Sequence, residues 1–280
     1  MQKLCTLAVL IHSVLLAQTL PAGVSVESNL SYGQFPETVM DIYQSKNSIT
    51  SAKRPGVIVF HGGDWVSGSR KSAIENFVIP YLEHGFVVAN VEYRQAGVAP
   101  APAAVVDALA AAGWFHDNAH RWNVDSKRIV ATGEGAGGHL ALMVGMTPKS
   151  AHLGPVRKVA AVINFYGITD VEDQLQGDNK RDYAMKWIPE QKGRYDLARR
   201  LSPLTEVRKK HVPPILSIHG NADEVVPYDQ SIELTKTLRN VHADAEMIAV
   251  PNGGHGFPPE VMSRIYPQIF EFLRRRRILK

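Results

Sequence analysis

The sequence of 280 residues predicts an α/β fold in which helices cover a mostly parallel central sheet. Short runs rich in β-branched residues alternate along the chain with amphipathic stretches of helical spacing. Most of these runs are almost continuously apolar, as strands buried on both faces of a parallel sheet should be. No linker rich in Pro, Ser or Gly divides the chain, so residues 23–280 are expected to form a single domain.

The predicted strands and helices follow one another through the whole chain. The earliest strand, residues 39–43, alternates apolar and polar residues and is expected at the edge of the sheet. Buried strands are predicted over residues 56–60, 86–91, 128–132, 159–165, 214–219 and 245–250. Helices are predicted where apolar residues recur at three- and four-residue spacing, over residues 72–84, 103–120, 136–146, 229–240 and 259–275.

The formal net charge of +4 comes from the C-terminal end of the chain, where the arginines at residues 274–277 and Lys280 lie close together. A nucleic-acid partner is not expected, because binding would need a basic surface spread over the fold. The single cysteine, Cys5, excludes a disulfide framework, a cysteine-based metal cluster and a cysteine nucleophile.

Residues 1–22 have the organisation of a secretory signal peptide. Lys3 precedes an apolar stretch over residues 4–17, and small residues up to Ala22 offer a cleavage site. The protein is therefore expected to be secreted or periplasmic, with no membrane contact once the leader is removed. A retained membrane anchor is the alternative, which the short apolar stretch and His12 disfavour.

Residues 168–205 differ from the rest of the chain in being rich in charged side chains and Gln, with Tyr183, Trp187 and Tyr195 interspersed. Two interpretations stay open. The segment is either a small cap over a ligand site or a polar surface excursion between two strands, because composition alone does not place an insertion.

Two glycine-rich segments directly follow predicted strands. Residues 60–65 read Phe-His-Gly-Gly-Asp-Trp, and glycines there allow main-chain N–H groups to face a site, as an oxyanion hole requires. Residues 133–140 read Gly-Glu-Gly-Ala-Gly-Gly-His-Leu and lie between a strand and a helix. That is the setting of a nucleophile elbow, Gly-x-Ser-x-Gly, but its middle position here is Gly135, which has no side chain.

Two further segments follow later strands. Residues 219–227 place Asp223 in a loop, and residues 253–257 place His255 in a glycine-rich loop. Taken alone, such an Asp is more often a turn residue, and such a His is more often a packing residue. Their order along the chain favours a catalytic role, because all four segments follow strands whose carboxyl ends form the ligand-binding edge of an open α/β sheet.

In these motifs the chain resembles the α/β-hydrolase superfamily, most closely the hormone-sensitive-lipase-like carboxylesterases and bacterial feruloyl-esterase-like relatives. The resemblance covers about residues 38–275. It implies an α/β-hydrolase fold with helices on both faces of the sheet, a small cap-like insertion and hydrolysis of a small-molecule ester without a cofactor. A metal centre is not expected, because His61, His219 and His255 fall in separate segments without the spacing of a zinc-binding pair.

The resemblance also implies roles for individual residues. His255 corresponds to the general base, Asp223 orients it, and Gly135 stands where the family has its serine. The oxyanion hole is expected from the main-chain N–H groups of Gly63, Asp64 and Ala136. Substrate contacts are expected from the aromatic residues near the site, Trp65, Tyr166 and Trp187.

Glycine at position 135 predicts an intact fold with serine-hydrolase activity that is lost or strongly attenuated. Three origins stay open: an engineered exchange, a natural non-catalytic binding protein that uses the same site, or hydrolysis by a water that His255 activates. By lineage the expected substrates are short acyl or aryl esters, including those on plant polysaccharides. A long-chain lipid is disfavoured because residues 168–205 are too charged for an apolar lid.

Overall fold

The computed structural model describes residues 20–46, 52–208 and 212–280. The predicted signal peptide, apart from its last three residues, lies outside these ranges. Among the described residues, no helix has the length and apolar character needed to cross a membrane.

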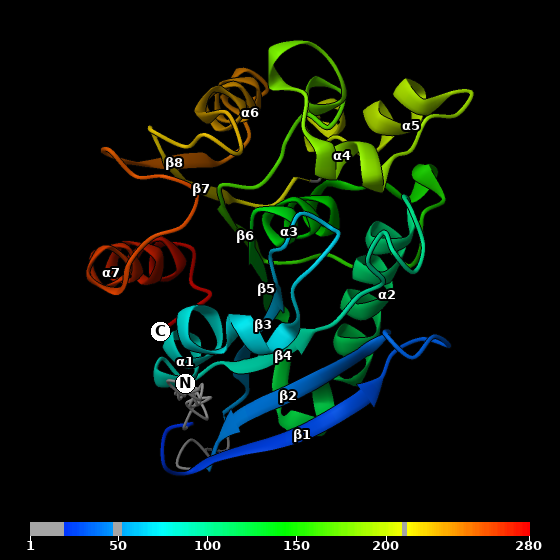
Figure 1. The fold of residues 1–280 in the computed structure, drawn as a ribbon. Coiled ribbons are helices and arrows are strands. Elements are labelled where there is room, and N and C mark those ends of the chain that lie inside the picture. The colour runs from blue at the N-terminus through cyan, green and yellow to red at the C-terminus, as the bar shows by residue number, and fades with distance from the viewer. Residues whose placement is uncertain (1–19, 47–51, 209–211) are drawn as a thin grey trace, which may run out of the picture.

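The described residues form an eight-stranded sheet with the order β1-β2-β4-β3-β5-β6-β7-β8 (Figure 1). Its strands are β1 (Val24–Ser31), β2 (Val39–Ser45), β3 (Arg54–Phe60), β4 (Val87–Val91), β5 (Val124–Glu134), β6 (Ala161–Phe165), β7 (Ile215–Gly220) and β8 (Ala245–Val250). The β1–β2 and β2–β4 pairs are antiparallel, and all pairs from β4 to β8 are parallel. The predicted mostly parallel sheet is therefore confirmed.

The edge of the sheet differs from the prediction. The strand expected at the edge is β2, which instead lies between β1 and β4. Sequence patterning missed β1 because its residues are partly or fully exposed and include no continuous apolar run. A solvated edge strand needs backbone pairing but little apolar burial, so it leaves a weak sequence signal.

Helices cover both faces of the sheet (Figure 1). They are α1 (Ile79–Glu83), α2 (Ala103–Asn118), α3 (Ala136–Met146), α4 (Asp182–Trp187), α5 (Arg194–Arg200), α6 (Tyr228–Asn240) and α7 (Pro259–Arg275). The helix predicted over residues 72–84 is instead a 3₁₀ turn (Arg70–Ala73), a π turn (Ile74–Val78) and the short α1. Pro80 lacks the N–H that an uninterrupted α-helix would need at this position.

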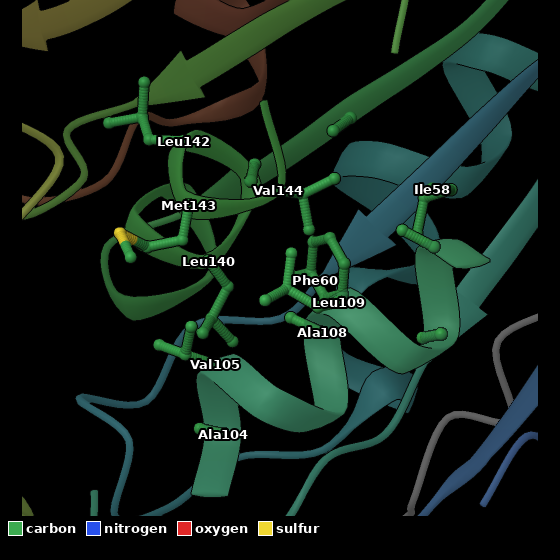
Figure 2. Packing of buried hydrophobic residues seen from close by; sticks show 14 of the residues in the cluster. Ile58, Phe60, Ala104, Val105, Ala108, Leu109, Leu140, Leu142, Met143 and Val144 are labelled. Carbon is green, nitrogen blue, oxygen red and sulfur yellow. The ribbon is translucent and has the colours of Figure 1, made fainter. Parts of the chain in front are cut away.

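The core is divided by the sheet into two apolar layers. Side chains of β3 alternate between them, with Ile58 and Phe60 in the layer of α2 and α3, and Val57 and Val59 in the layer of α1 and α7. Figure 2 shows the first layer, where Leu109 and its neighbours on α2 lie beside the apolar side chains of α3. Helix α3 is thus fixed directly behind the carboxyl end of β5, where the predicted elbow lies.

Candidate active site

The elbow between β5 and α3 is formed although it carries no side chain. Gly135 adopts φ 51° and ψ −116°, a backbone conformation that disfavours residues with a Cβ. Its N–H donates to the carbonyl of Phe165 over 3.0 Å, and its carbonyl accepts the N–H of His139 over 3.0 Å. The turn is therefore fixed by main-chain hydrogen bonds on both sides.

The structure brings Gly135, His255 and Asp223 together, as the motif order predicts. The Nδ1 atom of His255 lies 2.8 Å from Oδ2 of Asp223. A Cβ built on Gly135 would lie 3.0 Å from Nε2 of His255. Because a carboxylate can only accept, Nδ1 of His255 carries the proton, and Nε2 presents its lone pair toward the elbow.

Asp223 is held as a buried carboxylate. Its side chain has no exposed surface, and its Oδ1 accepts the N–H groups of Val225 and Val226 over 2.8 and 3.0 Å. Burial by itself would raise the pKa of Asp223, but hydrogen bonds from His219, His255 and the main chain outweigh it and hold the pKa below its usual range. The carboxylate therefore keeps its charge beside the imidazole.

His219 is a second histidine on the same carboxylate, and sequence reasoning assigned it no role. Its Nε2 lies 3.1 Å from Oδ2 of Asp223, and its Nδ1 lies 2.7 Å from Oγ of Ser231 on α6. Nε2 donates to the carboxylate, so Nδ1 accepts the serine hydroxyl proton. Its place at the end of β7, four residues before Asp223, was the available sequence signal.

Three consecutive residues of the loop after β3 have positive φ: Gly63 at 107°, Asp64 at 59° and Trp65 at 59°. A Cβ on Gly63 would lie 2.1 Å from the carbonyl oxygen of Ser67, so glycine is required there. Within the described part of the chain, the N–H groups of Gly63, Asp64 and Ala136 donate to no protein acceptor. The predicted oxyanion donors are thus without an acceptor among the described residues.

Asp64 occupies a half-buried position in this loop. Burial raises the pKa of its carboxyl group, and the positive charge that His255 can carry acts in the opposite direction. The charge of Asp64 is therefore sensitive to the protonation of His255.

Trp65 and Trp187, expected to contact substrate, have no exposed surface. Their rings stack with centroids 4.0 Å apart and an angle of 10° between planes. Each ring shields the other from solvent, so the pair packs the loop after β3, called the oxyanion loop below, against α4. Sequence shows that an aromatic residue lies near a motif, but not which way its ring faces.

Tyr166, the third aromatic residue expected to contact substrate, is also nearly buried. Its ring lies against that of His255, with centroids 4.6 Å apart. Its hydroxyl donates to Oε2 of Glu134 over 2.7 Å, so the elbow carboxylate has a partner of its own. Tyr166 therefore supports the imidazole from the end of β6.

His139 on α3 links the elbow to both neighbouring segments. Its Nδ1 accepts the indole N–H of Trp65 over 3.2 Å, and its Nε2 donates to the carbonyl of Leu201 over 2.7 Å. Burial lowers the pKa of His139 to about 4, against the opposing effect of the hydrogen bond to Leu201. The ring is therefore neutral at physiological pH, with its proton on Nε2.

The polar segment over residues 168–205 contacts two of the loops that form the site. The Nε atom of Arg181 donates to the carbonyl of Val225, beside Asp223, over 3.0 Å. The ring of Tyr183 lies 6.0 Å from that of Trp65. Within the described ranges, no three His, Cys, Asp or Glu side chains are grouped so that they could hold a metal ion.

Comparison with known proteins gives consistent matches over most of the chain. The model of the BD-FAE family matches residues 40–238. Esterase LipC of Mycobacterium tuberculosis is 30% identical over 239 residues, which is 81% of this chain and 58% of LipC. Isoprenylcysteine α-carbonyl methylesterase ICME of Arabidopsis thaliana is 24% identical over 82% of this chain and 56% of its own length. The chain thus spans little more than half the length of these curated relatives.

Solved structures extend the comparison. A truncated carbohydrate esterase from gut microbiota superposes with a TM-score of 0.72 and 25% identity, covering 88% of this chain and 95% of that one. The native esterase Est2 of Thermogutta terrifontis gives a TM-score of 0.74 at 22% identity, over 92% of this chain and 94% of that one, a likeness of fold.

Proposed function

The chain belongs to the BD-FAE family of α/β-hydrolase-fold esterases, and from this we propose that it is a carboxylesterase-type protein whose acyl-enzyme chemistry is lost or strongly attenuated at Gly135. Its proposed ligands are short acyl or aryl esters, including esters on carbohydrates. The carbohydrate esterase among its structural neighbours supports that class. The expected signal peptide would direct the protein out of the cytoplasm, to the periplasm or the exterior, where such esters occur.

A single observation supports the loss of the nucleophile most directly: a Cβ on Gly135 would stand 3.0 Å from Nε2 of His255. In the complete family chemistry, a serine oxygen at this point attacks the ester carbonyl while the imidazole takes its proton. The tetrahedral oxyanion is then stabilised by main-chain N–H donors, here those of Gly63, Asp64 and Ala136. Glycine removes the attacking oxygen and leaves the remaining groups in place.

A slower route remains open to the residues that are present. Nε2 of His255 can accept a proton from water as the water oxygen bonds to the ester carbonyl carbon. The tetrahedral intermediate then expels the alcohol, which takes the proton from the imidazolium, and a carboxylic acid is released. In serine proteases, loss of a triad member leaves roughly 10³–10⁴-fold acceleration over water. Weak turnover by this route is therefore part of the proposal.

We also propose that residues 168–205 form a cap over the site, supported by their contacts with Trp65 and Val225. The second candidate function is a non-catalytic binding protein. Gly135 favours this second candidate because glycine supplies no oxygen to attack an ester. The cap, the N–H donors without a protein acceptor and the His255–Asp223 pair could then bind an ester without cleaving it.

Hydrolysis of 4-nitrophenyl acetate by the protein, by Gly135→Ser and by Gly135→Ala tests the proposal. The serine variant is expected to gain several orders of magnitude in kcat/KM over the protein itself, while the alanine variant gains nothing. His255 must recede by a few tenths of an ångström to admit the new Cβ, and its side chain, 20% exposed, has room to do so. Adding His255→Ala should abolish turnover in every background.

The remaining outcomes separate the alternatives. A folded serine variant without activity that still binds the ester would overturn the esterase proposal in favour of the binding protein. Equal activity of the protein and Gly135→Ser would mean that water activated by His255, or a side chain other than that of residue 135, is the nucleophile.

A further inference from the structure

A cavity of about 910 Å³ lies at the opposite end of the sheet from the candidate active site. Its walls come from the beginning of β5, the segments that lead into β6 and β7, and the last turn of α3. Gly135 and Asp223 follow the carboxyl ends of β5 and β7, whereas this cavity lies at the amino ends of the same strands. Its volume falls within the usual range of small-molecule sites, about 300–1,000 Å³.

The inner wall of the cavity is apolar. Val144 and Met146 contribute from the C-terminal turn of α3, and Val159 contributes from the segment before β6; all are nearly or fully buried. These side chains belong to the same apolar layer that packs α2 and α3 against the sheet. The wall thus offers a ligand a rigid apolar surface of the kind that holds an alkyl or aryl group.

The rim is cationic. Lys127, Lys149 and Lys158 line the cavity and are exposed, and within the described ranges their ammonium groups have no hydrogen bond or ion pair. The carboxylate that lines the cavity is that of Glu206, which already pairs with Arg208 over 2.5 Å. The unbalanced positive charge is therefore complementary to an anion.

Thr147 contributes a buried polar atom to the wall. Thr147 follows α3, lines the cavity and is only 4% exposed. Its Oγ1 has no hydrogen-bond partner among the described residues. Because this oxygen has almost no exposed surface, the apolar wall and the lysines, and not this hydroxyl, are the groups offered to a ligand.

We propose that this cavity binds an amphiphilic anion, a carboxylate or sulfonate attached to an aryl or medium-length alkyl group. The apolar group lies against Val144, Met146 and Val159, and the anionic group lies among the three lysines. A polyanion such as a nucleic acid does not fit, because it would leave the apolar wall uncovered. A neutral hydrocarbon does not fit either, because it would leave the lysines unmatched. This proposal is independent of the proposed esterase function.

The test titrates the protein with 8-anilinonaphthalene-1-sulfonate and follows the rise in fluorescence, with the uncharged 1-anilinonaphthalene as the matched probe. Saturable binding of the sulfonate is expected, with the neutral probe at least tenfold weaker. The double variant Lys127→Glu, Lys158→Glu should weaken sulfonate binding at least tenfold. The control double variant Lys186→Glu, Lys192→Glu changes the net charge by the same amount, but on the polar segment over residues 168–205. It should bind the sulfonate as tightly as the unaltered protein does.

Competition identifies the source of the anion. Displacement by octanoate indicates an alkyl carboxylate, displacement by cinnamate an aryl carboxylate, and either result supports the proposal. Three results would overturn it: no saturable binding, equal weakening by both double variants, or displacement of the probe by a neutral ester that occupies the active site. Thermal melts of all variants verify that they are folded.

Discussion

The indole N–H of Trp65 donates to Nδ1 of the buried His139 over 3.2 Å, joining the oxyanion loop to the helix that begins at the elbow. Nε2 of the His139 imidazole donates to the carbonyl of Leu201, near the end of the polar segment over residues 168–205. Asp64 and Trp65 both hold positive φ, which costs free energy that the surrounding contacts must offset. His139 is therefore the point where three segments of the site fix one another.

Replacing His139 by Leu should destabilise the protein by about 3 kcal/mol, because the buried Trp65 N–H and the Leu201 carbonyl would both lose their partners. His139→Gln should recover part of that loss, since an amide offers both an acceptor and a donor. Urea unfolding of the two variants measures the difference. A leucine variant as stable as the unaltered protein would show that these hydrogen bonds contribute nothing.

The free energy of unfolding should decrease as the pH is lowered, because His139 becomes protonated. Burial lowers its pKa in the folded state to about 4, whereas an unfolded chain protonates a histidine near about pH 6.5. Below about pH 6.5 the unfolded state therefore binds the proton first, and the loss of stability reaches about 3 kcal/mol near about pH 4.

Unfolding free energies at about pH 7 and about pH 5 test this, and His139→Gln should lose less stability between them than the unaltered protein. His152→Gln alters an exposed histidine and serves as the control. If all three proteins lost the same free energy of unfolding between the two pH values, protonation of His139 would not be the cause of the loss.

Gly135→Ala should destabilise the protein more than Gly177→Ala. Both positions have positive φ, 51° and 61°. A Cβ at 177 meets nothing within 4 Å, whereas at 135 it approaches His255. Gly177→Ala isolates the cost of a Cβ at positive φ, about 1 kcal/mol. The excess at position 135 measures the contact with the imidazole together with the cost of a side chain at a ψ of −116°. Equal losses would mean that His255 moves away freely.

Asp223→Asn should flatten the acid limb of the stability curve. The folded-state pKa of Asp223 lies below its usual range, so its contribution is complete above the unfolded value of about 3.9 and is lost as pH falls further. At neutral pH the variant should be less stable by about 2 kcal/mol, because the charge-assisted hydrogen bonds from His219 and His255 are lost.

Unfolding free energies at about pH 7 measure the second effect, and those from about pH 5 to about pH 2 measure the first. The exposed Asp178→Asn provides the comparison. An acid limb unchanged in Asp223→Asn would exclude this carboxylate as its origin.

The sheet could be predicted where burial on both faces forces a continuous apolar run, as in β3 and β4. The exposed edge strand β1 could not, because pairing through the backbone makes few demands on side chains. Pro80 is a helix-disrupting residue, so a break in the predicted helix could be predicted from the sequence. The turns that replace the helix could not, because they depend on packing against the sheet.

Asp223 and His255 could be predicted because their loops follow strands whose carboxyl ends meet at one edge of the sheet. The buried histidines His139 and His219 lie within the elbow and Asp223 motifs. The position of His219, four residues before Asp223, was a sequence signal, but position alone does not show which atoms a histidine contacts. The sequence also does not show which way an aromatic ring points. For that reason it predicts Trp65 and Trp187 at the substrate, whereas the structure has both in the core.

The elbow of Gly135 keeps its backbone in place through hydrogen bonds that involve no side chain at that position. Serine and glycine codons include pairs that differ at a single base. A gene encoding this chain can therefore stand one point mutation from the residue its family uses, and selection could act on that step without any rebuilding of the fold. The loss proposed at position 135 is, in genetic terms, a reversible one.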